Sequence, residues 1–468
     1  MILYTNKMTE HNLEDDLNES EKWLVDGLKK IREKERLKKK EEFDRIKAIQ
    51  RTQLYRPEYT YKKTFPTGKV VSAICGIALL AAGIVYRNDI GNYFKSNANS
   101  KTTEFVDPVQ EFNNGLIASQ NSKNPVISDR ASNQHATLND DIPKTIRNEY
   151  TVVSGTYTID HDVIVKKNGK LIINEGCTIN FKEGKRIDVE EGLLKILGTV
   201  DKPVTLDAIQ NHLNSTQEYW EGIVIKNSDQ ENIIQYTTIR YAKKENIHEN
   251  IEDGGGIYIE KGKLDIQHSK IENCAAFMDG GGMFIKYSNV RIENSEIINN
   301  NAHMQGGGIY SSNSEINILQ SDINQNSSYS DGGGIYNSNT ILNIKQCNII
   351  NNKGEDGGGI AGGSLDNESK INIELTLLKG NHANYDGGGL RPNGAELILK
   401  RCSIIQNTAY EGGGIYHDGK NITIENTKIT DNQVEYNVGG IYSHMDIDHI
   451  SISGNTVIEN NYPNDIRE

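Results

Sequence analysis

The sequence predicts an all-β fold in which the chain winds into a solenoid of stacked parallel strands over about residues 149–468. Two observations carry this prediction. A glycine triplet recurs in eight copies at steps of 25, 26 or 30 residues, and short alternating apolar and polar stretches fill the intervals. A regular period of this length marks a repeat architecture. The copies start at Gly254, Gly280, Gly306, Gly332, Gly357, Gly387 and Gly412, and the last reads Val438-Gly439-Gly440.

Alignment of the copies on the glycines produces columns of like residues. Each triplet is followed by an apolar residue, then an apolar pair two residues apart, a small residue and another apolar residue, as in Ile309, Ile316, Ile318, Ser321 and Ile323. This spacing predicts three short strands per turn, with strands of successive coils pairing in parallel about 4.8 Å apart. The inward columns then build one continuous core, so no single coil is stable alone.

Two further columns follow from the alignment. Cys347 and Cys402 occupy the small inward column, which predicts that they pack as small hydrophobic residues and do not act as catalytic thiols. Asparagines recur six residues before the triplets, and stacked amides can hydrogen-bond along a ladder. They are Asn300, Asn326, Asn351, Asn381 and Asn432, with Asn407 and Asn273 displaced by one place in opposite directions.

The repeat also carries a resemblance. The run Ile297–Ala302, which reads Ile-Ile-Asn-Asn-Asn-Ala, followed by Gly306-Gly307-Gly308-Ile309, resembles the repeats of polymorphic outer-membrane proteins. Over about residues 150–468 the chain resembles the right-handed parallel β-helix (pectin-lyase-like) superfamily. This resemblance implies a right-handed solenoid of about 11–12 coils. It implies little about activity, because the same coil serves lyases, hydrolases, epimerases and adhesins.

The part before the solenoid divides by composition. We expect a disordered acidic tail at 1–19, a charged cytoplasmic helix at 20–69, a transmembrane helix at 70–87 and a flexible linker at 88–148. Val70–Tyr86 contains 17 residues without a charge, and a membrane span needs about 20, with a range of about 17–25. A cleavable signal peptide is disfavoured by the long region that precedes the run, and a buried helix of a soluble domain is the other alternative.

Charge indicates topology and excludes one class of partner. Residues 1–69 carry 17 Lys and Arg against 13 Asp and Glu, whereas residues 70–468 carry 34 against 51. The basic side of the apolar run predicts a cytoplasmic N-terminus and an exported solenoid, at the cell surface or in the periplasm. The acidic body argues against nucleic acid as a partner. The five cysteines form no C-x-x-C pair, so they indicate no zinc or redox motif.

An acidic column directly precedes the glycines. Stacked carboxylates repel one another unless something neutralises them, so one hypothesis is a row of calcium sites. The alternative is turn chemistry, in which each carboxylate accepts backbone hydrogen bonds. The candidate ligands are Asp253, Asp279, Asp331, Asp356, Asp386 and Glu411, and Gln305 and Asn437 stand at the two remaining positions.

An aromatic column follows the triplets. The preceding apolar column points inward, so alternation predicts that these rings point outward as an exposed strip for sugar stacking. The alternative is an aromatic ladder that stabilises the sheet from coil to coil. The candidate ligand-binding residues are Tyr258, Phe284, Tyr310, Tyr336, Tyr416 and Tyr442.

The fifth repeat is irregular, because 30 residues separate its triplet from the next and the aromatic column reads Ala361 and Arg391. His382, Asp386 and Arg391 lie near this irregularity and are the candidate catalytic residues, since a lyase needs a base and a cation. No paired Asp motif of polysaccharide hydrolases accompanies them.

The sequence thus favours a membrane-anchored surface protein that binds glycans or another cell's surface. The alternatives are a polysaccharide-active enzyme (lyase, hydrolase or epimerase) and a structural spacer. No cofactor is expected apart from calcium. The last coil ends at Ile458, and an uncovered end exposes strand edges, so we expect a homo-oligomeric partner or a crossing tail there.

Overall fold

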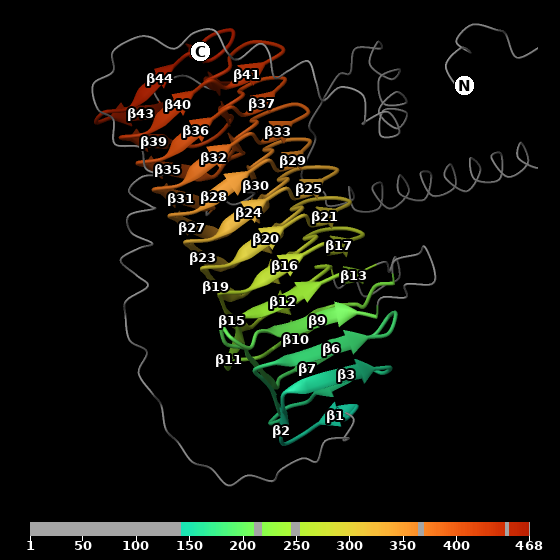
Figure 1. The fold of residues 1–468 in the computed structure, drawn as a ribbon. Helices are drawn as coiled ribbons and strands as arrows, with labels where there is room; N and C mark the ends of the chain where they lie inside the picture. The colour runs from blue at the N-terminus through green and yellow to red at the C-terminus, as the bar shows by residue number, and fades with distance from the viewer. Residues whose placement is uncertain (1–141, 210–217, 245–252, 364–368, 445–448, 468) are drawn as a thin grey trace, which may run out of the picture. The chain divides into compact units, whose positions relative to one another are not determined.

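The computed structural model describes residues 142–209, 218–244, 253–363, 369–444 and 449–467. Across these residues the ordered elements are strands, stacked as a parallel solenoid from β1 to the C-terminal end (Figure 1). The described part contains no helix that is long and apolar enough to span a membrane. Val70–Tyr86 and the other segments predicted before the solenoid lie outside the described residues.

Four sheets run along the solenoid. Sheet A contains β1 (Thr145–Ile146), β4 (Val163–Val165), β7 (Ile187–Glu190), β10 (Ile223–Lys226), β14 (Ile257–Glu260), β18 (Met283–Lys286), β22 (Ile309–Ser312), β26 (Ile335–Ser338), β30 (Ile360–Gly363), β34 (Leu390–Arg391), β38 (Ile415–His417), β42 (Ile441–Ser443) and β45 (Ile466–Arg467). Sheet B contains β2 (Glu149–Val152), β5 (Lys170–Asn174), β8 (Leu193–Leu197), β11 (Glu231–Gln235), β15 (Lys263–Gln267), β19 (Asn289–Glu293), β23 (Glu315–Leu319), β27 (Ile341–Lys345), β31 (Lys370–Glu374), β35 (Glu396–Lys400), β39 (Ile422–Glu425) and β43 (Ile450–Ser453).

The other two sheets complete each coil. Sheet C contains β3 (Gly155–Ile159), β6 (Cys177–Phe181), β9 (Val204–Ala208), β12 (Thr237–Arg240), β16 (Lys270–Glu272), β20 (Glu296–Ile298), β24 (Asp322–Asn324), β28 (Asn348–Ile350), β32 (Leu377–Lys379), β36 (Ser403–Ile405), β40 (Lys428–Thr430) and β44 (Val457–Glu459). Sheet D is short and contains β13 (Lys243–Lys244), β17 (Ala275–Ala276), β21 (Asn301–Ala302), β25 (Ser327–Ser328), β29 (Lys353–Gly354), β33 (His382–Ala383), β37 (Thr408–Ala409) and β41 (Gln433–Val434).

The fold prediction is confirmed as a right-handed-type parallel β-solenoid of about 11 turns. Every pairing between described strands is parallel and follows the predicted columns; in sheet A, for example, Ile257 pairs with Met283 and Met283 with Ile309. The number of strands per coil differs from the prediction, because from β13 onward a fourth strand of two residues closes each turn. In a strand of two residues, the alternation of apolar and polar side chains is too short to be recognised in the sequence.

The core is the set of inward columns that the alignment predicts. Ile257, Ile309 and Ile323 are fully buried, as are their equivalents in the other coils. Burial raises the pKa of the Cys347 and Cys402 thiols to about 12, which keeps both thiols protonated and agrees with their predicted packing role. At the C-terminal end, β45 continues sheet A by pairing in parallel with β42, and the covering of this end by a partner or a crossing tail stays a prediction.

A ladder of buried asparagines occupies the turn between sheets C and D. Asn326 Nδ2 donates to Ile297 O at 2.8 Å and to Asn352 Oδ1 at 3.1 Å, and Asn352 Oδ1 also accepts the Asn326 N–H. The prediction of Asn351 for this ladder is wrong, since Asn351 is exposed and takes the left-handed conformation (φ 56°). The members are Asn300, Asn326, Asn352, Asn381, Asn407, Asn432 and Asn461.

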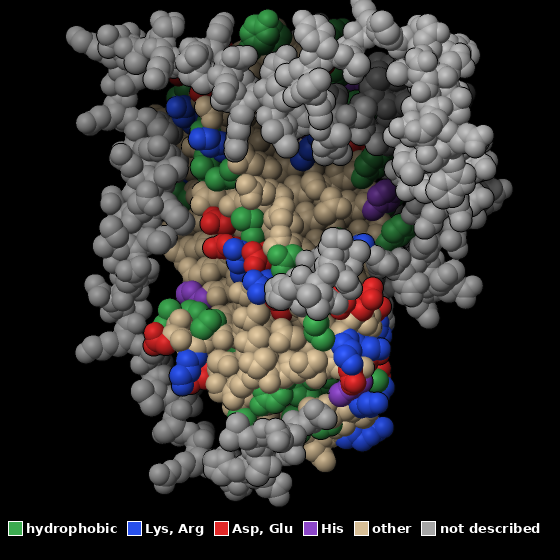
Figure 2. Space-filling model, turned by 45° about the vertical axis from the view of Figure 1, so that its right-hand side comes forward, with side chains coloured by type: hydrophobic (Ala, Val, Ile, Leu, Met, Phe, Trp, Pro, Cys, Tyr) green, Lys and Arg blue, Asp and Glu red, His purple; other side chains and the backbone are tan. Residues whose placement is uncertain are grey.

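The outer surface is polar, and its charges are largely paired across coils. Figure 2 shows hydrophobic side chains on the displayed face only in small separate patches, with acidic and basic side chains close to one another. Lys345 and Glu374 lie 2.8 Å apart on sheet B, and Lys270 and Glu296 lie 3.3 Å apart on sheet C. Exposed ion pairs contribute about 0–1 kcal/mol each to the free energy of unfolding. They therefore add little to the stability of the fold.

Candidate functional site: the glycine turn

The glycine triplet forms the turn from sheet D into sheet A, and each of its first two glycines is required for a different reason. Gly306 has φ 68°, in the left-handed region that glycine adopts without steric cost. A Cβ on Gly307 would lie 2.4 Å from the Ser327 carbonyl oxygen of the next coil. The triplet therefore allows backbones of adjacent coils to approach closely, and it places the acidic and aromatic columns on either side of the turn.

In the C-terminal half, Arg391 on β34 lies among the acids, although burial and the Asp356 carboxylate still raise the pKa of Asp386 to about 7. Its guanidinium forms an ion pair with Asp356 through Nη1, lies 3.5 Å from Asp386 Oδ2, and donates through Nε to Asp418 Oδ2 at 3.1 Å. Burial opposes this charge, but the carboxylates of Asp356, Asp418 and Asp386 outweigh it and raise the Arg391 pKa. The guanidinium also lies over the Tyr416 ring, 5.3 Å from its centroid.

In the N-terminal half, the acidic column takes up protons. Burial and the nearby Asp279 carboxylate raise the pKa of Asp253 to about 8. Burial and Asp331 raise the pKa of Asp279 to about 7. Gln305 separates two of the acids, because its backbone N–H donates to Asp279 Oδ1 at 2.9 Å and its Nε2 donates to Asp331 Oδ2 at 3.3 Å.

The turn-chemistry interpretation accounts for these hydrogen bonds, whereas calcium binding stays a prediction. Within the described ranges, no group of three or more His, Cys, Asp or Glu side chains is arranged to hold a metal ion. A divalent cation needs several ionised carboxylate oxygens at once. Asp356 is already bound by Arg391, and the raised pKa values of Asp253 and Asp279 disfavour their ionised forms.

The aromatic column is a stacked ladder rather than an exposed strip. Ring centroids of Tyr258 and Phe284 lie 5.3 Å apart, those of Phe284 and Tyr310 4.7 Å, and those of Tyr310 and Tyr336 5.5 Å, all nearly parallel. Tyr258 is 5% exposed, and Phe284 and Tyr416 are each 8% exposed. The prediction of an exposed strip is wrong for these three residues, because a column that points outward can still be covered by its own neighbours.

The three candidate catalytic residues are only partly brought together. Asp386 and Arg391 form the ion pair described above. His382 Nδ1 instead lies 2.8 Å from Thr408 Oγ1 on sheet D. Burial and the positive charge of Lys353 lower the His382 pKa. Among the described residues, no hydrogen bond or ion pair joins His382 to Asp386 or Arg391. The structure therefore shows an ion pair and a separate histidine instead of an acid–base trio.

A second aromatic group at this turn was missed by the sequence reasoning. One aromatic or histidine ring precedes the acidic column in six coils, and we name this group the rim aromatics: Phe277, His303, Tyr329, Tyr385, Tyr410 and Tyr436. The first three rings stack at 5.6 and 5.4 Å, and Tyr410 and Tyr436 stack at 5.6 Å. The only sequence signal for this group is a ring close before the residue that precedes the glycines, at two residues from it in the first three coils and at one in the last three.

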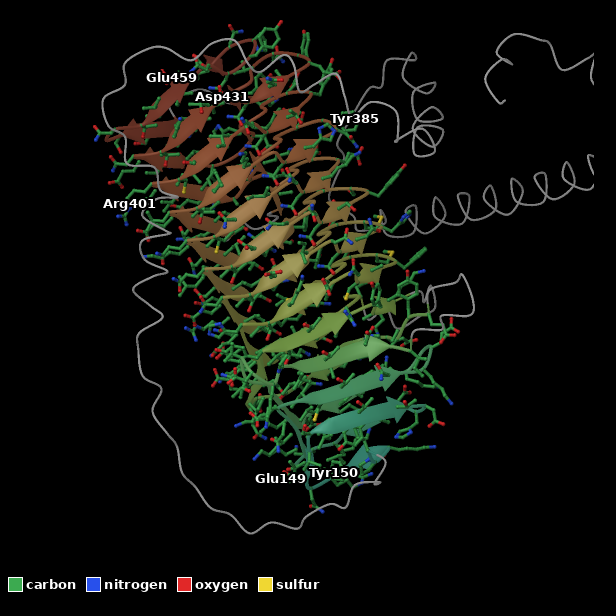
Figure 3. The ribbon with its side chains drawn as sticks, in the orientation of Figure 1. Glu149, Tyr150, Tyr385, Arg401, Asp431 and Glu459 are labelled. Atoms are coloured by element: carbon green, nitrogen blue, oxygen red, sulfur yellow. The ribbon has the colours of Figure 1, made fainter. Side chains whose placement is uncertain are left out.

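Three of the six rim aromatics are exposed, and the other three are half-buried. Tyr329 is 73% exposed, Tyr385 49% and Tyr436 56%. Figure 3 shows Tyr385 at one edge of the ribbon, on the side of sheet D, and Arg401 at the opposite edge. The glycine turn therefore presents a line of rings along the solenoid, whereas the predicted strip lies stacked on sheet A.

The chain matches no protein-family model, no curated protein and no solved structure.

Proposed function

We propose that this chain is a membrane-anchored surface protein whose solenoid binds an extended polymer, a glycan of a cell surface, along the glycine turn. The observation that carries the proposal is the exposure of Tyr329, Tyr385 and Tyr436. Anchoring by Val70–Tyr86, export of the solenoid and membership of the pectin-lyase-like superfamily belong to the same proposal and rest on the sequence pattern alone.

The arrangement of the rim aromatics suits a polymer better than a small molecule. The same turn supplies the rings in three successive coils up to Tyr329 and in three from Tyr385 onward, with one coil between them that has Glu355 at this turn. Within each set the rings repeat along the solenoid axis at the coil spacing. An exposed ring offers an apolar surface and, in tyrosine, a hydroxyl group at its tip. A linear glycan presents C–H faces and hydroxyl groups at a similar regular interval, and its many weak contacts add along the chain.

A polysaccharide-active enzyme receives less support from the geometry. The Arg391 guanidinium is shared among Asp356, Asp386 and Asp418, so its charge is already paired with carboxylates of the protein. His382 bonds to Thr408. A general base must lie within hydrogen-bond reach of the proton that it removes. Asp386, whose pKa is raised to about 7 by burial and the Asp356 carboxylate, lies beside the candidate cation Arg391, whereas His382 belongs to a separate network.

The test is binding of the full-length chain to a glycan array, compared with a variant that combines Tyr329→Ala, Tyr385→Ala and Tyr436→Ala. We expect glycan binding by the native chain and at least about tenfold weaker binding by the variant, since truncation of exposed aromatic anchors typically costs more than about 1 kcal/mol each. Ile341→Ala is the matched control, because Ile341 is an exposed apolar residue on the outer side of sheet B.

Three other outcomes would each decide against the proposal. Release of new sugar ends from a uronic-acid polymer would favour the enzyme. Absence of both binding and turnover would favour the spacer. Equal binding by the native chain and the triple variant would exclude the rim aromatics as the contact surface.

A further inference from the structure

The outer side of sheet B carries an ordered pattern of side chains in its C-terminal half. Four successive strands, β27, β31, β35 and β39, are paired in register, so their outward side chains form three columns across the strands. We name these three columns the sheet B face. Arg401, which directly follows β35, lies at the opposite edge of the ribbon from Tyr385, so this face is separate from the glycine turn (Figure 3). The middle column is uncharged and reads Asn343, Asn372, Ile398 and Thr423.

The charges of the sheet B face invert across a line between β31 and β35. On β31 the first column carries Lys370 and the third carries Glu374. On β35 the same columns carry Glu396 and Lys400, so both signs are reversed. On β27 and β39 the first column is uncharged, and the third is positive on β27 and negative on β39. Each strand is thus the charge inverse of the strand at the same distance on the other side of the line.

Ion pairs within the chain leave these charged side chains accessible. Lys345 lies 2.8 Å from Glu374, and Lys400 lies 3.4 Å from Glu425. The four side chains are nevertheless 30–50% exposed. Glu374 and Lys400 stand in register on the two sides of the line, and they form no ion pair with each other within the described residues. An exposed ammonium or carboxylate group has several donors or acceptors and can therefore bind a second partner.

The middle column gives the sheet B face its shape. A hollow of about 320 Å³ lies over this column and is lined by Asn343, Asn372 and Ile398 together with charged side chains of the third column. Asn372 Nδ2 donates to Asn343 Oδ1 at 2.8 Å, which holds the two amides against each other. Ile398 is half-buried and follows these amides in the column. The face thus offers an apolar side chain and, one strand away, a hollow that can receive one.

We infer that two copies of this chain associate through the sheet B face, with their solenoids antiparallel. A two-fold axis parallel to the strands, midway between β31 and β35, places each strand opposite its charge inverse. Ile398 then lies opposite Asn372 of the second copy, at its hollow. Every charged side chain of the face meets an opposite charge, and the pairs across the interface are Glu374 with Lys400, Lys370 with Glu396 and Lys345 with Glu425.

A parallel arrangement of the two copies accounts for fewer of these charges. A two-fold axis along the solenoid places the first column opposite the third. This arrangement also pairs the charges of β31 and β35, but it leaves Lys345 and Glu425 opposite uncharged side chains. Charge complementarity across an interface fixes the partner and its register, so the arrangement that pairs all the charges is favoured.

The size of the face indicates a weak contact. Four strands at about 4.8 Å spacing and five residues at about 3.3 Å each cover about 19 Å by 16 Å, which is less than the roughly 800 Å² per partner of a standard interface. Association is therefore expected at high local concentration, as on a crowded surface. An antiparallel pair has the N-terminal ends of its two solenoids on opposite sides, so under the proposed anchoring it joins two facing membranes. This consequence rests on the proposed function, whereas the dimer itself does not.

The experiment measures self-association of the full-length chain by sedimentation equilibrium in a mild detergent, from about 5 to 200 µM. The variants are Glu374→Lys, Lys400→Glu and an equimolar mixture of the two. Each variant alone sets like charges against each other at both central pairs. In the mixture, a copy with two central lysines meets a copy with two central glutamates, so both central contacts again join opposite charges.

Two further variants complete the set. Ile398→Asn removes the apolar side chain but introduces a residue that the same column already holds at Asn372. Lys270→Glu is the matched control, because it reverses a lysine of sheet C that is 36% exposed and lies 3.3 Å from Glu296. The melting temperature of each variant is measured alongside.

We expect the native chain to dimerise, each charge variant to dimerise at least about tenfold more weakly, and the mixture to recover the native affinity to within about threefold. Ile398→Asn should weaken dimerisation about fivefold, and Lys270→Glu should leave it unchanged. Raising the salt from about 0.05 M to 0.5 M should weaken the native dimer. Melting temperatures should change little, since the exchanged charges are exposed.

A native chain that stays monomeric throughout this range, or equal dimerisation by the native chain and both charge variants, would overturn this inference. Weakened variants that the mixture does not restore would exclude the antiparallel arrangement, because a parallel pair keeps like charges in contact in the mixture as well. Glycan binding by a monomeric chain would leave the proposed function intact, and a blank glycan array with an intact dimer would leave this inference intact.

Discussion

The repulsion between stacked carboxylates is reduced in different ways in the two halves of the acidic column. Both halves stack a carboxylate at the same turn position in successive coils, where like charges raise each other's pKa. Around Arg391, a guanidinium bridges Asp356, Asp386 and Asp418, and only at Asp386 do burial and the Asp356 carboxylate still raise the pKa, to about 7. At Asp253 and Asp279, protonation reduces the negative charge, because burial and the neighbouring carboxylate raise both pKa values. An acidic column in a solenoid therefore does not by itself indicate metal binding.

The largest expected effect is that of removing the cation. Arg391→Ala would leave three partly buried carboxylates without a partner, and we expect the unfolding free energy to fall by about 3 kcal/mol, the lower end for a broken buried pair. Urea denaturation at pH 7 measures this change. Arg391→Lys should recover only part of the loss, since an ammonium is a point charge and cannot bridge three carboxylates as a planar guanidinium does. If Arg391→Ala were as stable as the native chain, Arg391 would not be what neutralises the acids of the C-terminal half.

The asparagine ladder provides the baseline for this comparison, because it runs through both halves. Asn326 and Asn407 each donate to a carbonyl and to the next amide of the ladder. Replacement by Ala leaves buried groups without partners, so we expect each variant to lose about 2 kcal/mol, equally in the two halves. Thermal unfolding with matched buffers checks this.

The control for the ladder is Asn351→Gly. Asn351 is exposed with φ 56°, and the equivalent residue of the next coil is already Gly380 with φ 65°. This substitution should change the unfolding free energy by less than about 0.5 kcal/mol. A large loss here, or clearly unequal losses at Asn326 and Asn407, would mean that the halves differ in more than their acidic columns.

The sequence was sufficient for the coil and its core because each inward column repeats a simple pattern. Ile257, Met283 and Ile309 recur at a fixed distance from the glycines, and parallel pairing then follows from stacking. Asn351 was chosen over Asn352 because both are asparagine and that coil is one residue shorter, so counting from the glycine selects the wrong one.

The candidate site was less predictable for a physical reason. Alternation gives the direction of a side chain but not what covers it, so the buried ladder of Tyr258 and Phe284 looks like an exposed strip. The rim aromatics change their distance to the acid by one residue between Tyr329 and Tyr385, which hides them from a strict column alignment. The charge inversion of the sheet B face gives no periodic signal, since it is seen only when β27, β31, β35 and β39 are placed in register.

Substitution of single acids should change the unfolding free energy less than loss of Arg391 does, but with opposite signs in the two halves. The folded pKa of Asp279, about 7, exceeds its ordinary value of about 3.9. The folded state therefore holds its proton more tightly, and the contribution of this group to stability is lost as the pH rises from about 4 through 7. Asp279→Asn removes this loss and should raise the unfolding free energy at pH 8 by about 1–2 kcal/mol, with little change at pH 4. Asp356→Asn should instead lower it at pH 8 by about 1 kcal/mol, since it removes a carboxylate bound by Arg391. Urea midpoints at pH 4, 6 and 8 measure the change in unfolding free energy for each variant. If both variants changed it in the same direction at pH 8, the two halves of the column would not differ in how their carboxylates are neutralised.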